Sequence, residues 1–186
     1  MNAIQTDGLT KFYGKSRGII DLDLEVHEGE FYGFIGPNGA GKSTTIRILM
    51  GMIHKTRGSA KILGKDILKD KEQILSVTGY LPSEAVFYPD MRGRDLIRLS
   101  ADLRRKDCRK ASADLCERLQ LDPSRRISEL SFGNRKKLAV VCALQHDPLL
   151  CILDEPTGGL DPLMQREFFE ILKESNKKGM TVFLSS

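Results

Sequence analysis

The chain has 186 residues, of which 40% are hydrophobic and 29% are charged. This composition supports one core of ordinary size and excludes a disordered or collagen-like chain. The net charge of +4 does not require a nucleic-acid partner. The longest apolar run, Leu138 to Leu144, is far shorter than the roughly 18 residues of a membrane-spanning helix. We therefore expect one domain, residues 1–186, without a membrane span.

The first part of the chain contains strand patterns around one predicted helix. Residues 20–26 alternate apolar and acidic side chains, which predicts a half-buried and usually antiparallel strand. Residues 31–35 are apolar throughout, which predicts a strand buried on both faces of a parallel sheet. A helix should follow over residues 42–50. Short strands are predicted over residues 60–63 and 77–81, and we expect both around the same sheet.

From about residue 90 to 129 the apolar period becomes helical, which predicts a helical insertion. Its expected buried stripes are Leu96, Leu99 and Leu103, then Ala111, Leu115 and Leu119. A third helix should begin near Asn134, and a fourth should span residues 162–177 between apolar strands at 149–153 and 180–184. This alternation predicts an α/β fold.

The cysteines and histidines point to no catalytic or metal site. Cys108, Cys116, Cys142 and Cys151 match no common zinc spacing, and two of them lie inside apolar segments. We interpret all four as reduced packing residues. The three histidines are scattered along the chain without partners.

A glycine-rich turn joins the strand at 31–35 to the helix at 42–50 and fits the phosphate-binding pattern G-x-x-x-x-G-K-[ST]. Glycines let the backbone amides wrap a phosphate, and the helix N-terminus adds positive charge. Lys42 would place its charge on the outer phosphates, and Ser43 would offer a hard oxygen to Mg²⁺. The predicted nucleotide-binding residues of this loop are Gly36, Pro37, Asn38, Gly39, Ala40, Gly41, Lys42, Ser43 and Thr44.

Two adjacent carboxylates end the apolar strand at 149–153, at the sheet edge where α/β proteins bind ligands. Asp154 can hold the hydration shell of Mg²⁺. Glu155 points elsewhere, because successive strand side chains alternate, and it can orient or deprotonate an attacking water. Standing alone, the pair would be interpreted as a solvated strand end.

The segment LSFGN at residues 130–134 opens the third predicted helix, with Ser131 as its capping hydroxyl. Together with the two motifs above it makes the chain similar to the nucleotide-binding domain of ATP-binding cassette (ABC) proteins. GPNGAGKST resembles their Walker A loop, LSFGN their signature, LLCILDE their Walker B strand and catalytic Glu, and residues 159–161 their D-loop. The likeness runs from Leu9 to Ser186.

The resemblance implies an ATPase with ATP and Mg²⁺ as its cofactors. It implies a parallel-sheet core, an antiparallel N-terminal β-subdomain and a helical subdomain at about 88–129. Tyr13 takes the place of the adenine-stacking aromatic. Two such domains close head to tail, as a homodimer or a heterodimer. Ser131, Gly133 and Asn134 then contact the γ-phosphate of the partner's nucleotide, with Asp161 also at the site.

The sequence LSFGNRKKL at residues 130–138 most resembles that of ATPase subunits of drug, antibiotic or ion exporters whose membrane permease is a separate chain. The resemblance therefore implies integral membrane permease partners, contacted by residues 88–129, and a cytoplasmic location at the inner face of the membrane. It implies no nucleic acid. A soluble ABC ATPase of ribosome or DNA work is the alternative, although tandem domains and a strongly basic insertion are missing. An unrelated P-loop kinase or GTPase would give no reason for LSFGN.

Two positions depart from the family pattern. Ser83 stands where the Q-loop has Gln, so coupling between Mg²⁺ and the permease would fall to Glu84 or to water. The chain stops at Ser186, where the family places its switch histidine next. We therefore expect the C-terminal part of the domain to be missing, with ATP binding retained and hydrolysis poor.

Overall fold

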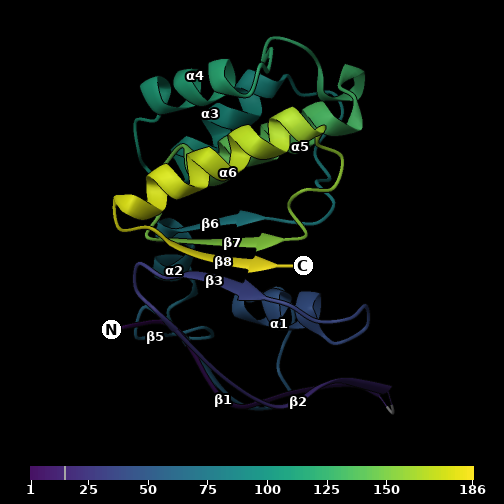
Figure 1. Cartoon of the computed structure of the whole chain (residues 1–186), viewed down its shortest axis with the longest axis vertical. Coiled ribbons are helices and arrows are strands. Elements are labelled where there is room, and N and C mark those ends of the chain that lie inside the picture. The colour runs from purple at the N-terminus through teal and green to yellow at the C-terminus, as the bar shows by residue number, and fades with distance from the viewer. Residues whose placement is uncertain (15) are drawn as a thin grey trace.

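The computed structural model describes residues 1–14 and 16–186, which form two sheets with helices between and beyond them (Figure 1). In chain order the elements are β1 (Asn2–Tyr13), β2 (Ser16–His27), β3 (Phe31–Phe34), α1 (Lys42–Leu49), β4 (Arg57–Ile62), β5 (Lys65–Asp66), α2 (Lys71–Val77), β6 (Thr78–Leu81), α3 (Gly93–Leu103), α4 (Arg109–Arg118), the 3₁₀ turn η1 (Ile127–Glu129), α5 (Phe132–Leu144), β7 (Leu150–Asp154), α6 (Pro162–Lys177) and β8 (Thr181–Ser185). The α/β fold with an antiparallel N-terminal sheet and a helical insertion is confirmed.

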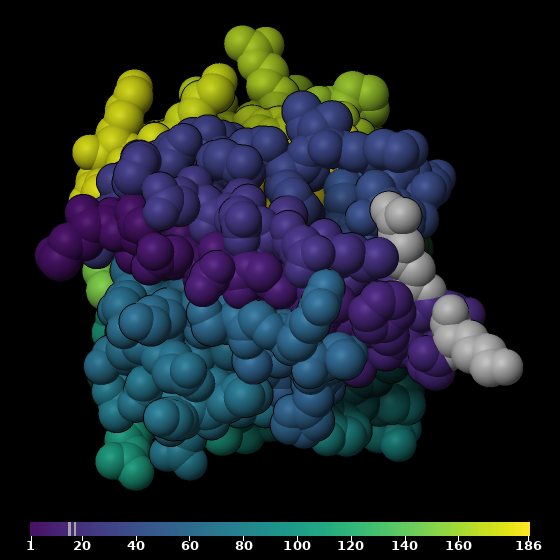
Figure 2. Space-filling model, turned by 90° about the horizontal axis from the view of Figure 1, so that it is seen from below, coloured from purple at the N-terminus to yellow at the C-terminus, as the bar shows by residue number. Residues whose placement is uncertain are grey.

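The antiparallel sheet has the strand order β2-β1-β4-β5, and its outer surface occupies much of the face in Figure 2. The predicted alternation holds at Leu24 and Val26, which are buried. Toward the start of β2 it fails, because Ile20 is 42% exposed and Ile19 is buried instead. Asp21, the residue after Ile20, has a φ of 47°, and the pairing of β1 with β2 shifts register between Ile19 and Leu22. This irregularity exchanges the two faces of the strand.

The parallel sheet has the strand order β3-β8-β7-β6. β7 is buried along its whole length, as a central strand should be. The prediction that residues 31–35 are buried on both faces is wrong, since Phe31 is 41% and Ile35 81% exposed. Among the described residues β3 pairs with β8 alone, so it forms an edge of this sheet. Edge strands shield their side chains on fewer sides.

The strands predicted at 60–63 and 77–81 belong to different sheets, which corrects the expectation that they share one. β4 joins the antiparallel sheet and β6 joins the parallel sheet. Residue Val77 ends α2, a short helix that the sequence pattern did not indicate. Both strands are short, and a short pattern does not specify the strand's partner.

Helix α1 lies between the two sheets (Figure 1). Its Ile46, Ile48 and Leu49 are buried in one cluster with side chains of the antiparallel sheet, such as Val26, and of the parallel sheet, such as Phe183. This packing fixes the start of α1, and the glycine-rich turn before it, against both sheets.

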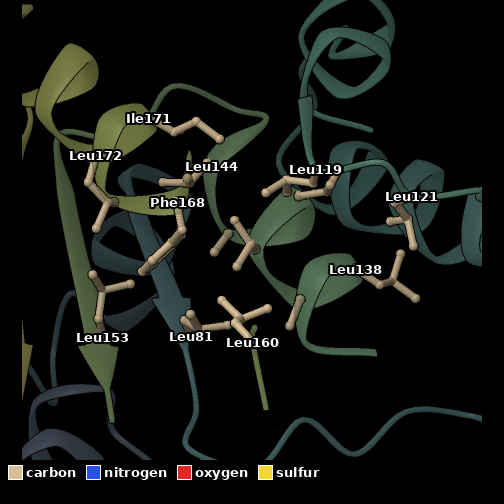
Figure 3. Packing of buried hydrophobic residues seen from close by; sticks show 14 of the residues in the cluster. Leu81, Leu119, Leu121, Leu138, Leu144, Leu153, Leu160, Phe168, Ile171 and Leu172 are labelled. Carbon is tan, nitrogen blue, oxygen red and sulfur yellow. The ribbon is translucent and has the colours of Figure 1, made fainter. Parts of the chain in front are cut away.

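A second core covers the other face of the parallel sheet, beneath α5 and α6 (Figures 1 and 3). Leu153 of β7, Phe168 of α6 and Leu119 after α4 meet in this cluster, so the helical insertion is packed onto the core. The stripe predicted on α3 is wrong in part: Leu99 is 39% and Leu103 74% exposed. The buried positions are instead Gly93, Ile97 and Ala101.

The four cysteines are free thiols, and three of them are buried, which agrees with a packing role. Within residues 1–14 and 16–186, no cluster of His, Cys, Asp and Glu has the makings of a metal centre. In the same residues, no helix is both long and apolar enough to cross a membrane.

Candidate functional site

The glycine-rich turn leaves β3 and enters α1 through residues with left-handed backbone. Gly39 has a φ of 81° and Gly41, the N-cap of α1, has a φ of 94°. A β-carbon on Gly41 would also lie 2.3 Å from Ile19 Cγ2 and 2.9 Å from the Gly18 carbonyl oxygen. Gly41 is therefore required both by its conformation and by the close approach of β2.

Lys42 lies at the first position of α1 and is 7% exposed. Its Nζ donates to the carbonyl oxygen of Gly36 and, at 3.3 Å, to that of Pro37. The ammonium group of Lys42 thus lies against the glycine-rich turn, where we expect it to bind phosphates. A phosphate in the loop could replace these neutral acceptors with charged ones.

The predicted Mg²⁺ ligands lie together. Ser43 Oγ donates to Asp154 Oδ1 over 3.1 Å, and Ser185 Oγ donates to the same oxygen over 2.8 Å. Asp154 is 1% exposed, and within the described residues it has no ion-pair partner. The pKa of Tyr80 is raised, mainly because Tyr80 is partly buried and to a smaller extent because of the negative charge of Asp154. Among the described residues only hydroxyl groups donate to the Asp154 carboxylate. A buried carboxylate without a charged partner favours the binding of a cation.

Glu155 follows β7 with a φ of 45°, an unusual value for a residue with a β-carbon. Its backbone N–H donates to Ser185 Oγ over 3.1 Å, and its side chain is exposed. Ser185 therefore holds Asp154 through its carboxylate and Glu155 through its backbone. The two carboxylates have different surroundings, although Glu155 lies beyond the end of β7, where strand alternation no longer applies.

These elements enclose a cavity of about 240 Å³ at the start of α1. It is lined by Tyr13, Gly18, Pro37, Asn38, Gly39, Gly41, Lys42, Ser43, Thr44 and Glu155. Tyr13 is far from the glycine-rich turn in sequence and 47% exposed, with Lys11 Nζ 5.1 Å from its ring centroid. The cavity thus joins an aromatic ring, a glycine-rich turn and a carboxylate.

The remaining predicted site residues lie outside this cavity. Ser131 is the N-cap of α5, and its Oγ accepts from the Asn134 N–H over 3.2 Å. That amide, expected to bind a phosphate, is therefore engaged by the cap. Asp161 likewise caps α6 and accepts from Met164 N–H over 3.0 Å.

The LSFGN segment and residues 159–161 are packed against one another. A β-carbon on Gly133 would lie 2.7 Å from the Gly159 carbonyl oxygen. One on Gly159, whose φ is 81°, would lie 2.2 Å from the ring of Phe132. The two segments that the resemblance assigns to a neighbouring nucleotide therefore share one surface of this chain.

Three residues in or beside the site have no role that the sequence pattern predicts. Ser185 and Gly18 lie in strands, where nothing in the local pattern marks them. Lys136 looked like one of several basic residues of α5, but it is 1% exposed and its Nζ donates to carbonyl oxygens of Pro82 and Ser83. The helical period of the sequence gives no signal of this burial.

A family model for ABC transporters matches residues 19–158. The chain belongs to the ABC transporter family. One ABC relative, the bacitracin transport ATP-binding protein BcrA of Bacillus licheniformis, is 37% identical over 189 residues, covering 98% of this chain and 61% of that protein. The linearmycin resistance ATP-binding protein LnrL of Bacillus subtilis is 31% identical over 192 residues, covering 98% and 60%. The chain thus spans about 60% of the length of these two relatives.

Solved structures support the ABC fold. One titled as the ATP binding subunit of an ABC transporter superposes with a TM-score of 0.93 at 30% identity, covering 99% of this chain and 79% of that one. The dimeric structure of MJ0796, a bacterial ABC transporter cassette, gives 0.88 at 23% identity, covering 98% and 87%. At that identity the second match speaks for the fold alone.

Proposed function

We propose that the chain binds and hydrolyses ATP as the ATP-binding subunit of an ABC transporter that exports its substrate through a separate membrane permease. One observation carries the proposal: the cavity brings Tyr13, the glycine-rich turn and Glu155 together from three separate parts of the chain. Such a cavity offers a flat ring to a purine and amides and an ammonium to phosphates. It also offers the Glu155 carboxylate as a candidate acceptor of a proton from water.

ATP binding would use residues 36–44 as a cradle. Amides of the glycine-rich turn and the N-terminus of α1 would bind the phosphates, and Lys42 would transfer its hydrogen bonds from the loop carbonyls to the outer phosphates. Tyr13 would stack on the adenine, because its exposed ring lines the same cavity.

The residues present fit Mg²⁺. Ser43 and Asp154 offer hard oxygen donors in contact with one another, and the buried Asp154 carboxylate has no cationic partner in the described ranges 1–14 and 16–186. When bound, Mg²⁺ would neutralise phosphate charge during transfer. Ser185 would keep Asp154 oriented toward it.

Glu155 would orient the attacking water and accept its proton. Its side chain is exposed toward the cavity while its backbone is tied to β8 through Ser185. A carboxylate held in this way can act as a general base at the terminal phosphate.

A second copy, or a related domain, would complete the site. Ser131, Gly133, Asn134 and Asp161 do not line this chain's own cavity, so the nucleotide contacts that the resemblance assigns to them would be made to a nucleotide held by a partner. Binding of such a nucleotide would require the Asn134 amide to leave the Ser131 cap or share it. We propose a head-to-tail dimer on this basis.

The helical subdomain, residues 88–129, would receive the permease. Between α3 and α4 lies a groove of about 740 Å³ with Ile97, Ala101 and Cys116 in its lining. Its charged lining residues are Arg94, Arg98, Asp102, Lys106, Asp107 and Arg109. Arg98 pairs with Asp102 and Arg109 pairs with Asp107. The lining keeps an excess of two positive groups, which favours a short cytosolic permease segment that carries acidic side chains.

The names of relatives guide the proposal about cargo. Proteins named for bacitracin transport and linearmycin resistance are among them, as is YbhF of Escherichia coli, a probable multidrug ABC transporter ATP-binding protein that is 35% identical over 190 residues (98% of this chain, 33% of that protein). We propose export of an antibiotic or drug-like molecule, with the chain at the cytoplasmic face of the cell membrane.

Photocrosslinking in living cells tests the transport assignment. A crosslinking amino acid replaces Arg98 in the groove, and a control replaces the exposed Lys61 of β4. We expect position 98, and not position 61, to capture an integral membrane protein identified by mass spectrometry. Capture of a soluble protein at position 98, or equal capture at both positions, would overturn the proposal in favour of a soluble ABC ATPase.

A further inference from the structure

The side chain of Lys136 carries a positive charge into the interior beside the candidate site. It lies in the second turn of α5 and is 1% exposed. Burial lowers the pKa of its ammonium, whereas the negative charges of Asp154 and Glu155 raise it. A buried cation is retained only where several acceptors compensate for its lost hydration.

Three backbone carbonyls supply that compensation. Lys136 Nζ donates to Pro82 O over 2.8 Å and to Ser83 O over 2.9 Å, and it lies 3.5 Å from Glu155 O. These acceptors come from two loops, one leaving β6 and one leaving β7. A single ammonium group therefore joins α5 to both segments.

Each of the two loops matters to the proposed reaction. Glu155 holds a φ of 45°, so its backbone needs outside support to stay in place. Residues 82–83 begin the connection from the parallel sheet to the helical insertion. At the other end of the contact, α5 starts at Ser131, which is proposed to meet the partner's nucleotide.

We propose that Lys136 is a positioning residue for ATP hydrolysis, holding the backbones of Glu155 and of Pro82–Ser83 in one arrangement with the signature helix. The inference rests on the proposed role of Glu155. Lys136 itself does not line the nucleotide cavity. Its ammonium donates to the carbonyl oxygen of Ser83, the position at which the resemblance expects a glutamine.

The test compares Lys136→Met with Lys137→Met, which removes a neighbouring, partly exposed ammonium of the same helix. Hydrogen–deuterium exchange is followed in peptides covering residues 78–83 and 150–155, which contain the hydrogen-bonded amides of β6, of β7 and of Glu155. Loss of a charge-assisted contact should raise exchange about tenfold in both peptides of Lys136→Met and leave Lys137→Met unchanged. Unchanged exchange in either peptide of a folded Lys136→Met chain would overturn the proposal.

Nucleotide measurements separate positioning from general stability. We expect ATP affinity of Lys136→Met to stay within about twofold while single-turnover hydrolysis slows about tenfold. Equal loss of affinity and turnover, or unchanged turnover, would overturn it. If Lys136→Met fails to fold, Lys136→Gln, which retains a donor, takes its place with the same criteria. Absence of hydrolysis in the parent chain would count against the proposed function, and the exchange data would still decide the role of Lys136.

Discussion

Ser43 Oγ and Asp154 Oδ1 are 3.1 Å apart although 111 positions separate the two residues in sequence. One belongs to the first turn of α1 and the other ends β7. Their contact turns two separate sequence motifs into one oxygen-rich site, held in register by Ser185.

Asp154→Asn should abolish the gain in ATP affinity that Mg²⁺ gives the parent chain. The substitution keeps a side chain of the same shape but removes the charge that the cation would meet. Calorimetric titration with ATP, with and without Mg²⁺, measures the effect. Without Mg²⁺ the two chains should bind ATP similarly. An undiminished Mg²⁺ effect in the variant would disprove the assignment of Asp154.

Lys42→Ala should weaken ATP binding by about 10- to 100-fold, because one charge-assisted contact to the phosphates is lost. Lys61→Ala, which removes an exposed lysine of β4, is the matched control and should leave affinity unchanged. Titration with a fluorescent ATP analogue provides the measurement. Equal affinity in the Lys42 variant and the parent chain would contradict the function assigned to the loop.

Glu155→Gln should keep ATP binding and stabilise an ATP-bound dimer. The amide cannot accept a proton from water, so the nucleotide stays intact while the loop and its Lys42 remain available. Light scattering coupled to size exclusion, with ATP in the buffer, reports the dimer. Glu72→Gln on the exposed side of α2 serves as control and should elute as the parent chain does. A monomeric Glu155→Gln chain saturated with ATP would refute the dimer mechanism.

Gly41→Ala and Gly39→Ala separate strain from steric overlap, because both glycines have positive φ but only the Gly41 β-carbon would meet other atoms. We expect Gly39→Ala to cost about 1–2 kcal/mol from backbone strain alone. Gly41→Ala should cost more and also weaken ATP binding, since the loop and β2, which contains Gly18 and Ile19, must move apart. Urea unfolding measures both variants. Equal costs would show that the contact with β2 is unimportant.

His146 is 1% exposed, and in the described part of the chain neither ring nitrogen has a hydrogen-bond partner. Burial first, then the charge of Arg104, lowers its pKa from 6.5 to about 4. Between about pH 4 and pH 6.5 the unfolded chain therefore binds a proton at His146 that the folded chain does not bind. The free energy of unfolding should fall as pH drops from 7 to 5, by at most about 2 kcal/mol from this group.

His146→Gln should flatten that pH dependence, whatever its effect on stability at pH 7. His54→Gln replaces an exposed histidine and should leave the dependence as it is in the parent chain. Urea unfolding at pH 7, 6 and 5 gives the slopes. A His146→Gln slope as steep as that of the parent chain would show that His146 is not the group responsible.

The sequence by itself determined the features that depend on neighbouring residues. The turn at residues 36–43 can be predicted from the sequence because the strand, the glycines, the lysine and the helix follow one another directly. Local conformation therefore fixes their arrangement. The helix predicted over about residues 162–177 is α6, which Asp161 caps, Pro162 begins and Gly179 follows. The α/β class followed from the same local periods.

Only the tertiary structure decided which elements meet. Exposure of β3, the separation of β4 from β6 and the buried face of α3 depend on neighbours distant in sequence, which an apolar pattern does not name. For the same reason Ser185 and Lys136 carried no local signal. Their roles arise where chain segments far apart come within hydrogen-bond distance, and hydrogen bonds act only over that short range.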